Sequence, residues 1–522
     1  MVRKNLLGKK GGLILLLLLL CGIGMQFIRP GLNNPAITGD LAAPPAVKQI
    51  LERACYNCHS NQPTLAWFDQ IVPAYWLVRA DILEARKALN FSEWDSLSKD
   101  QQKGKLFEAL NKIQFKEMPL RQYRFLHSGA NITEPEMAVL RSYLDTLAPV
   151  NIADPKRDQA GNKQYADWVV RNLYAAGLTP GGELARKSDS GKFQPLPVKP
   201  ALNGIAYIPE YKDWEVISTT DRWDNGTLRA ILGNEIAVRA IKEQHTNPWP
   251  DGTQFAKVAW DAVLDSTGHV HAGEFKQVEF MIKDSHKYAD TEGWGWGRWK
   301  GTDLKPYGKT ATFMSECTSC HKPMKDFDYV FTMPRNLGSA IPSGDSHAAN
   351  RNGNPGMSKD DSPGINGNNS AGMSENDARA LNPLDWKIIT SSVNKKDTTM
   401  ATLYGNELAL KFARFGPDWG YPPGVVMVLV TWKPEADERW FGGKIPGTVL
   451  SIERVSFNGT GDGIAQSGKG KVALQNEAGK DSGQISYEKY EGTPLTKSAT
   501  DNSPAVKNRI AYLAGLRASV MP

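Results

Sequence analysis

The hydrophobic pattern divides the chain into a helical first part and a strand-rich second part. Apolar positions recur at helical spacing over residues 47–54 and 137–147, and residues 133–136 carry the capping-box pattern that starts a helix. Beyond residue 204, β-branched and aromatic runs bounded by turn residues predict strands over 214–220, 227–232, 253–264 and 275–282, with a helix over 234–242. The pattern therefore predicts a multidomain α+β protein.

The N-terminal segment is apolar from residue 11 to residue 28 and follows Arg3, Lys4, Lys9 and Lys10. A run of this length with a positive flank predicts an uncleaved membrane helix within residues 1–30 and a translocated remainder. A cleaved signal is the alternative, although no A-x-A cleavage site follows. We therefore expect the chain on the periplasmic side of a bacterial inner membrane.

The charge of the chain changes this picture little. Its 522 residues carry a formal net charge of +6 and no concentrated basic run beyond the N-terminus, which argues against nucleic-acid binding. Four of the five cysteines belong to two CxxCH motifs, and the fifth is Cys21 in the apolar segment. No structural disulfide is therefore expected.

Both CxxCH motifs have the pattern of c-type haem attachment, in which two cysteines form thioethers and the histidine binds iron. The residues are Cys55, Cys58 and His59 in the first motif and Cys317, Cys320 and His321 in the second. A redox pair or half a zinc site does not require the histidine. We therefore expect two covalently bound haems.

A second iron ligand for the first haem is predicted in the loop before the helix at 133–147. Met118 lies there beside a proline, and a methionine thioether at the sixth position suits electron transfer. His127 is the competing ligand, and Met118 as an ordinary core residue is the third interpretation.

The strand-rich part contains an internal repeat. Trp214, Gly233 and Trp260 recur 172 positions later as Trp386, Gly405 and Trp432. No CxxCH follows residue 321, and Leu429 takes the place of Lys257. We therefore expect a haem-bearing copy over 204–337, a Gly/Asn/Ser-rich linker over 338–380 and a haemless copy over 381–522.

The first part resembles the bacterial haem-binding domain found after N-terminal anchors. The resemblance rests on residues 50–60, 72–78 and 89–94 and covers about residues 25–148, although the aromatic stretch at 63–68 departs from the family pattern. It implies a small all-α c-type haem domain over 31–150, followed by a helical connector over 151–203.

Residues 204–336 resemble a cytochrome P-460 domain through segments 211–214, 247–253, 278–285, 317–321 and 330–332. This resemblance implies an antiparallel β-rich domain, and with the repeat it implies two such domains in tandem. The haem of the first has His321 as proximal ligand and an open distal side. The resemblance also implies that Lys257 is joined to the porphyrin edge, whereas a surface charge is the ordinary role of a strand lysine. A branch resembling cytochrome c-prime-beta lacks that bond, so the crosslink stays open.

The same resemblance makes Glu279 the distal carboxylate, able to accept protons as a substrate is oxidised. Because the haemless copy retains Glu453 near the equivalent place, a structural role for this carboxylate is the alternative. The aromatic stretch 294–299 either lines the haem or packs in the β core. His269, His271 and His286 are interpreted as surface or loop residues.

Together these features predict an anchored dihaem oxidoreductase that oxidises a small nitrogen compound, hydroxylamine above all. Its electrons would pass to the N-terminal haem and then to a redox partner, either a cytochrome or a quinone-linked protein. The alternatives are a nitric oxide binder or sensor without turnover and a plain electron-transfer protein. Cytochrome P-460 proteins are typically homodimers, so we expect the haemless copy to act as an in-chain partner in a monomer.

Overall fold

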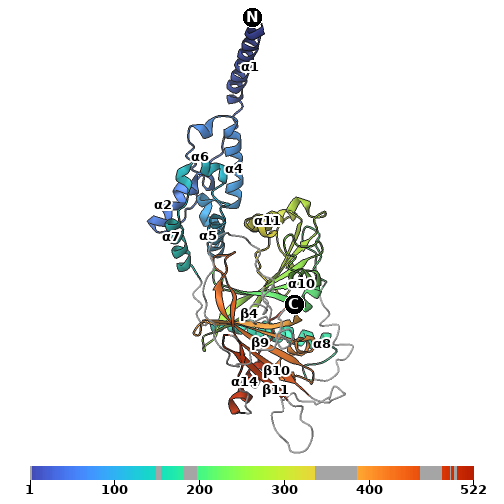
Figure 1. Cartoon of the computed structure of the whole chain (residues 1–522). Coiled ribbons are helices and arrows are strands. Elements are labelled where there is room, and N and C mark those ends of the chain that lie inside the picture. Colours follow the sequence, from blue (N-terminus) through green and yellow to red (C-terminus); the bar gives the residue numbers. More distant parts are fainter. Residues whose placement is uncertain are drawn as a thin grey trace, which may run out of the picture. The chain divides into compact units, whose positions relative to one another are not determined.

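The computed structural model describes residues 3–148, 154–181, 197–334, 385–458, 485–493, 495–498 and 503–522. The chain forms two compact units, Met1–Ala148 and Pro149–Pro522. The first is helical and the second is built on strands (Figure 1). The predicted linker over 338–380 lies outside the described residues.

The first unit consists of short helices joined by tight turns. Its elements are α1 (Arg3–Gln26), α2 (Pro45–Ala54), α3 (Tyr56–His59), η1 (Phe68–Gln70), α4 (Ala74–Ala88), η2 (Phe91–Ser96), α5 (Lys99–Gln114), α6 (Arg121–Leu126), η3 (Ser128–Ala130) and α7 (Glu134–Thr146). Both helices predicted from periodicity are present, as α2 and α7. The predicted capping box is also formed, because the backbone N–H of Thr133 donates to Glu136 Oε2 at 2.8 Å.

The apolar N-terminal segment forms α1. In the part of the chain that the structure describes, no helix combines the length and apolar character needed to cross a membrane. The membrane-spanning helix predicted within residues 1–30 is therefore not found there.

The core of the first unit lies between the apolar faces of α2, α5 and α7. Val47, Ile50 and Leu51 of α2 are buried, as are the apolar positions of α5 and α7 that repeat every three or four residues. Tyr56 stacks on Phe91 with ring centroids 4.6 Å apart. This packing fixes α3, which carries the first CxxCH motif.

Among the residues that the structure describes, the second unit contains twelve strands in one sheet. In the first copy of the repeat these are β1 (Glu215–Arg222), β2 (Thr227–Gly233), β3 (Gln254–Leu264), β4 (His269–Lys283), β5 (Trp294–Lys300) and β6 (Lys305–Pro306). In the second copy they are β7 (Lys387–Asn394), β8 (Thr399–Gly405), β9 (Val426–Ala436), β10 (Lys444–Phe457), β11 (Ile485–Glu491) and β12 (Thr496–Lys497). All four predicted strands are present, but β4 begins six residues earlier than expected because it pairs with β3 almost to the turn.

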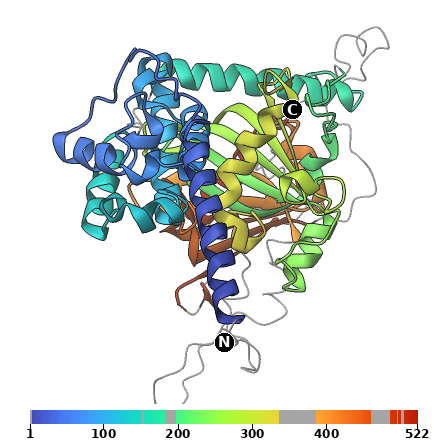
Figure 2. The same ribbon diagram turned by 90° about the horizontal axis from the view of Figure 1, so that it is seen from above.

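Helices and 3-10 turns flank this sheet. They are α8 (Pro155–Ala175), η4 (Pro209–Asp213), α10 (Glu235–Lys242), η5 (Ala289–Thr291), η6 (Ala311–Phe313), α11 (Met314–His321), η7 (Lys322–Phe327), α13 (Glu407–Ala413), η10 (Pro417–Trp419) and α14 (Pro504–Ala514). The long helix α8, teal in Figure 2, packs against β4. Gln164 of α8 accepts a hydrogen bond from the backbone of Phe275 at 2.6 Å, so the predicted connector is part of this unit.

The predicted repeat is visible in the strand register. Trp260 of β3 lies opposite Leu228 of β2, and Trp432 of β9 lies opposite Met400 of β8. Each copy then places an asparagine, Asn234 or Asn406, at the start of its short helix. The two copies therefore share one local structure and not merely similar residues.

Two strand pairings join the copies. β4 pairs with β7 around His271 and Ser392, and β10 pairs with β1 at Lys444 and Asp221. The sheet consequently closes into a ring, in which the first strand of each copy pairs with a strand of the other copy. The strands of this ring are β1, β2, β3, β4, β7, β8, β9 and β10. One continuous core contains Trp260 and Trp432, so the copies are halves of one unit where two tandem domains were expected.

Candidate haem sites

The first CxxCH motif presents a histidine suited to bind iron. Nδ1 of His59 lies 2.9 Å from the carbonyl oxygen of Leu89, so Nδ1 carries the proton that is donated. Burial lowers the pKa of His59, which keeps the imidazole neutral. The other ring nitrogen, Nε2, is then the one able to bind a metal.

The two candidates for the second ligand of this haem differ in their surroundings. Nδ1 of His127 lies 3.1 Å from the Tyr123 carbonyl, and Nε2 lies 2.9 Å from Asp69 Oδ2. Both ring nitrogens therefore face oxygen acceptors, and binding iron would break one of these contacts. Met118 follows α5 in the segment where it was predicted, and its role as sixth ligand stays a prediction.

The second motif repeats the arrangement of the first. Nδ1 of His321 lies 2.7 Å from the carbonyl oxygen of Tyr329. Burial lowers the pKa of His321 to about 4, so the ring is neutral near pH 7. The imidazole lies between Trp296 and Phe331, with ring centroids 4.4 Å and 5.0 Å away.

His321 lines a cavity of about 300 Å³ together with charged residues from each of the strands β1 to β5. The register places Glu279 of β4 directly opposite Lys257 of β3 on one side and Arg298 of β5 on the other. These three side chains therefore form a row across one face of the sheet. Cys320 of α11 lines the same cavity.

Glu279 is paired with both of its neighbours. Its Oε2 lies 2.7 Å from Lys257 Nζ, and its Oε1 lies 3.3 Å from Arg298 Nε. Burial raises the pKa of Glu279, but the charges of Arg298 and Lys257 outweigh it and hold that pKa well below its usual range. Glu279 is therefore an ionised carboxylate inside the cavity.

Lys257 is shifted in the opposite sense. Burial, aided by the charges of Arg229 and Arg298, lowers the pKa of Lys257 to about 8 despite its pairing with Glu279. Its side chain keeps 29% of its surface exposed and lines the cavity, so it is not an ordinary surface lysine. An amine that loses its proton near pH 8 can act as a nucleophile.

The donors in this cavity and on the adjoining helix α11 fit a haem. Burial raises the pKa of Cys317 to about 12, so its thiol is protonated, and no disulfide involves the motif cysteines in the described part of the chain. The indole N–H of Trp296 is buried without a protein acceptor, and buried donors of this kind usually have a partner. A porphyrin has carboxylate groups that can accept a hydrogen bond from the Trp296 indole. Its edge also supplies the carbon atoms with which the two cysteine thiols form thioethers.

The aromatic stretch 294–299 contributes both to the cavity wall and to the sheet core. Trp296 and Arg298 line the cavity, whereas Trp299 is fully buried in the sheet core. The alternation along β5 separates these side chains onto two faces.

Two features of this cavity were missed from the sequence. Arg229 of β2 lines it, and an arginine inside an apolar strand run was a signal for a buried charge. The cavity wall also includes Asp437, Trp440 and Ile445 of the second copy. Nothing in the local sequence indicated that contact, since it depends on how the copies pair.

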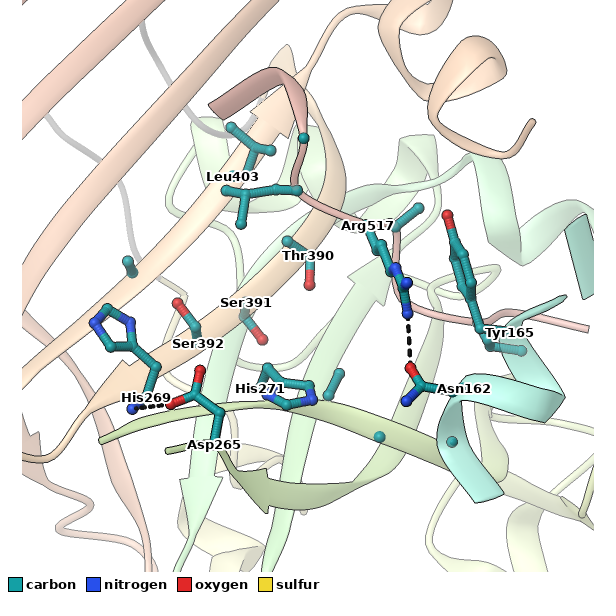
Figure 3. A pocket seen from close by; sticks show the side chains of 18 of the residues that line it. Asn162, Tyr165, Asp265, His269, His271, Thr390, Ser391, Ser392, Leu403 and Arg517 are labelled. Atoms are coloured by element: carbon teal, nitrogen blue, oxygen red, sulfur yellow. Dashed lines mark hydrogen bonds between the residues drawn. The ribbon is translucent and has the colours of Figure 1, made fainter. Parts of the chain in front are cut away.

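The second copy has a cavity of about 430 Å³ at the corresponding place (Figure 3). Leu403 and Leu429 line it where Ile231 and Lys257 line the first cavity, and its lining contains no cysteine. His269 and His271, expected on the surface or in loops, lie on β4 and line this second cavity. Its chemistry is therefore not that of a c-type haem site.

The surroundings of Glu453 show what this carboxylate does in the second copy. Glu453 lies opposite Leu429 as Glu279 lies opposite Lys257, but it accepts hydrogen bonds from Arg509 at 2.6 and 2.7 Å and from Tyr487 at 2.7 Å. In the second copy this carboxylate is thus a structural ion pair, as the alternative interpretation held.

The comparisons with known proteins agree with this geometry. Residues 20–146 match the family model of a haem-binding domain, and residues 208–332 match that of cytochrome P460. No curated protein matches the chain. The second copy lies beyond the matched residues, so its membership of the same family stays a prediction. The chain therefore joins an N-terminal haem-binding domain to a cytochrome P460 domain.

Proposed function

We propose that this protein is a dihaem c-type cytochrome that oxidises a small nitrogen compound, most directly hydroxylamine, at the cavity beside His321. The observation that carries the proposal is that an ionised carboxylate, Glu279, lines the same cavity as the iron-binding candidate His321. Oxidation of hydroxylamine releases protons as well as electrons, and a carboxylate in the cavity can accept them.

The proposed reaction removes two electrons and two protons from NH2OH and leaves HNO. A bound haem supplies an iron that accepts electrons one at a time. Glu279 accepts the protons, while Arg298 keeps it ionised between turnovers. The electrons pass to the haem held by Cys55, Cys58 and His59, with Met118 as sixth ligand, and then to a redox protein outside the chain.

We also propose that Lys257 becomes joined to the second haem. Its lowered pKa supplies a neutral amine in the cavity that Cys320 and His321 also line. The new bond joins Nζ to a carbon of the porphyrin edge. One N–H and one C–H bond break, and the two protons and two electrons reduce a peroxide to water. Mass spectrometry of haem peptides tests this directly.

The proposed location is the periplasmic side of the bacterial inner membrane. Two c-type attachment motifs support it, because haem is attached to such motifs outside the cytoplasm. Fractionation of cells that express the full chain, with immunodetection of the protein, checks the location.

The test of function uses the full chain with both haems, hydroxylamine and ferricyanide as a one-electron acceptor. We expect hydroxylamine-dependent reduction of ferricyanide, and a loss of at least about a hundredfold in turnover in Glu279→Gln. Glu488→Gln removes the same charge from a half-buried pair on β11 and should leave turnover unchanged. If the wild-type protein reduces no acceptor, hydroxylamine oxidation is wrong.

A nitric oxide binder without turnover is the second candidate. The observation in its favour is that Glu279, held between two cations, is a weak base. Tight binding of nitric oxide to the ferrous protein, no turnover and an unlinked Lys257 peptide would support it.

A plain electron-transfer protein is the third candidate. Met333 lines the same cavity as His321, and a thioether there could complete the coordination of iron. Failure of the ferrous protein to bind carbon monoxide at either haem would support this function.

A further inference from the structure

A strained turn supplies the hydrogen bond that orients His321. Asp328 and Tyr329, which are consecutive and not glycine, have φ values of 49° and 64° in the left-handed region. Such conformations persist only when the surrounding structure holds them, and they gather at functional sites. Here the turn directs the Tyr329 carbonyl to Nδ1 of His321, 2.7 Å away.

The first copy holds this turn through the side chain of Asp328. Oδ1 lies 2.7 Å from Nζ of Lys283 on β4, and Oδ2 accepts from the backbone N–H of Trp249 at 2.8 Å. Asp328 and Lys283 are 8% and 7% exposed. This ion pair is therefore largely shielded from water and fixes the start of the turn to the sheet.

The second copy holds the residues that follow the turn. Arg439 donates from Nη1 to the carbonyl oxygens of Val330 at 3.0 Å and Thr332 at 3.3 Å. Between these two carbonyls, Phe331 lies against Trp440 with ring centroids 5.6 Å apart. The segment that presents the Tyr329 carbonyl is thus held from both copies.

Arg439 and Trp440 belong to the loop between β9 and β10, residues 437–443. The backbone of this loop is hydrogen-bonded to itself, between Asp437 N and Gly443 O at 3.0 Å and between Gly443 N and Trp440 O at 3.2 Å. The matching loop of the first copy, 265–268, is three residues shorter. The longer loop is the one that faces the haem cavity.

We propose that Arg439 of the haemless copy is a positioning residue for the proximal histidine of the other copy. By fixing residues 330–332, it keeps the Tyr329 carbonyl on Nδ1 of His321. A proton donated from Nδ1 makes the imidazole a stronger base and a stronger iron ligand, which favours ferric over ferrous iron. The inference rests on the proposed haem site but not on the identity of the substrate.

The test compares Arg439→Met with wild type in the full chain carrying both haems. We expect the Fe–His stretching band of the ferrous protein, seen by resonance Raman, to move to lower frequency. We also expect the midpoint potential of the second haem to become more positive, while the first haem keeps its potential. Arg439→Lys retains a hydrogen-bond donor, so its Fe–His frequency and its midpoint potential should lie between those of Arg439→Met and wild type.

Arg454→Met is the matched control. Arg454 lies on β10 of the same copy and is paired with Glu488 at 3.7 Å, and in the described part of the chain no bond joins its side chain to the turn or the loop. It should leave both haem signals as in wild type. Asp328→Asn, which tolerates the left-handed turn but weakens the pair with Lys283, should shift them in the same direction as Arg439→Met.

The proposal is wrong if Arg439→Met folds with both haems and leaves the potential of the second haem unchanged. It is also wrong if Arg454→Met produces an equal shift, because any charge loss in that copy would then suffice. If the ferrous wild-type protein shows no Fe–His band, the expectation of a five-coordinate iron at the second haem is wrong. The midpoint potentials of wild type and Arg439→Met then still test the role of Arg439. If the protein does not oxidise hydroxylamine, the Raman bands and midpoint potentials of the variants still test this proposal.

Discussion

At the scale of single residues, the state of Glu279 depends on its two cationic neighbours. Burial alone would raise its pKa, and Arg298 and Lys257 reverse that effect. A carboxylate with a strongly lowered pKa stays ionised but is a weak base. Loss of the positive charge on Lys257, whether by mutation or by bond formation at Nζ, should therefore make Glu279 a better proton acceptor.

The first prediction concerns that charge. Lys257→Met should raise the pKa of Glu279, because burial and the remaining pair with Arg298 then act without the ammonium. Infrared spectra recorded against pH, with Glu279→Gln to identify the band, would follow protonation of this carboxyl. A protonation midpoint equal to that of wild type would show that Lys257 does not control Glu279.

The second prediction concerns Glu453, which is 4% exposed. Burial raises its pKa, but hydrogen bonds from Arg509 and Tyr487 outweigh it and lower the pKa below the usual value. The resulting stabilisation is complete above the unfolded-state pKa of about 4.3 and is lost as pH falls through the lower folded pKa. Glu453→Gln should therefore lower the free energy of unfolding by about 2 kcal/mol at neutral pH.

Urea unfolding at neutral and at acidic pH measures this difference. The gap between Glu453→Gln and wild type should narrow as the pH falls below about 4. Glu488→Gln, on the neighbouring strand β11, breaks a half-buried pair with Lys497 and should cost less than about 1 kcal/mol at any pH. A gap for Glu453→Gln that does not depend on pH would contradict the ion-pair account.

At the scale of elements, the two copies start their short helices with the same asparagine. Asn406 Oδ1 accepts from the backbone N–H of Ala409 at 2.9 Å, and its Nδ2 donates to the Gly424 carbonyl at 2.8 Å. Asn234 makes the matching bonds to Ala237 and Gly252. Each asparagine thus caps a helix and ties it to the segment before the next strand.

The third prediction follows from this pair. Asn406→Ala should lower the free energy of unfolding of the second unit by about 1–2 kcal/mol, and Asn234→Ala should have an equal effect. Thermal or denaturant unfolding of the full chain measures both. A much larger effect at Asn234 would mean that the first cap also supports the haem cavity.

Most of these elements could be predicted from the sequence, whereas their pairing could not. The strands follow from the β-branched and aromatic runs between turn residues, and the repeat follows from matching residues at a constant offset of 172. Both haem motifs follow from the spacing of their cysteines and histidine. The row formed by Lys257, Glu279 and Arg298 depends on strand register, and β3 and β4 shift register between Ala259 and Trp260. Local sequence does not encode that shift. The resemblance therefore suggested Lys257 and Glu279, whereas Arg298 was considered only as part of the stretch 294–299 and not as a partner of Glu279.

At the scale of the second unit, closure of the ring makes each copy depend on the other. β1 is paired on one side by β10, and β4 by β7, so neither copy has complete strand partners alone. The core that contains Trp260 and Trp432 is continuous across both copies. That the second copy acts as an in-chain partner in a monomer stays a prediction.

The fourth prediction tests this dependence. A fragment of residues 154–522 should be monomeric in light scattering, because both joining pairings are made within the chain. A fragment of residues 154–334 should self-associate or fail to fold, since it exposes the edges of β1 and β4 and half of the core. A stable monomer of the shorter fragment would contradict the shared-core account.

The unequal loops between the paired hairpin strands have a consequence for how mutations are tolerated. Residues 437–443 touch the segment that orients His321, whereas residues 265–268 border the cavity whose lining contains no cysteine. In a saturation-mutagenesis screen for haem signal, we expect the longer loop to accept few substitutions and the shorter one many. The copy without a haem would then tolerate fewer substitutions in this loop than the copy that carries the haem.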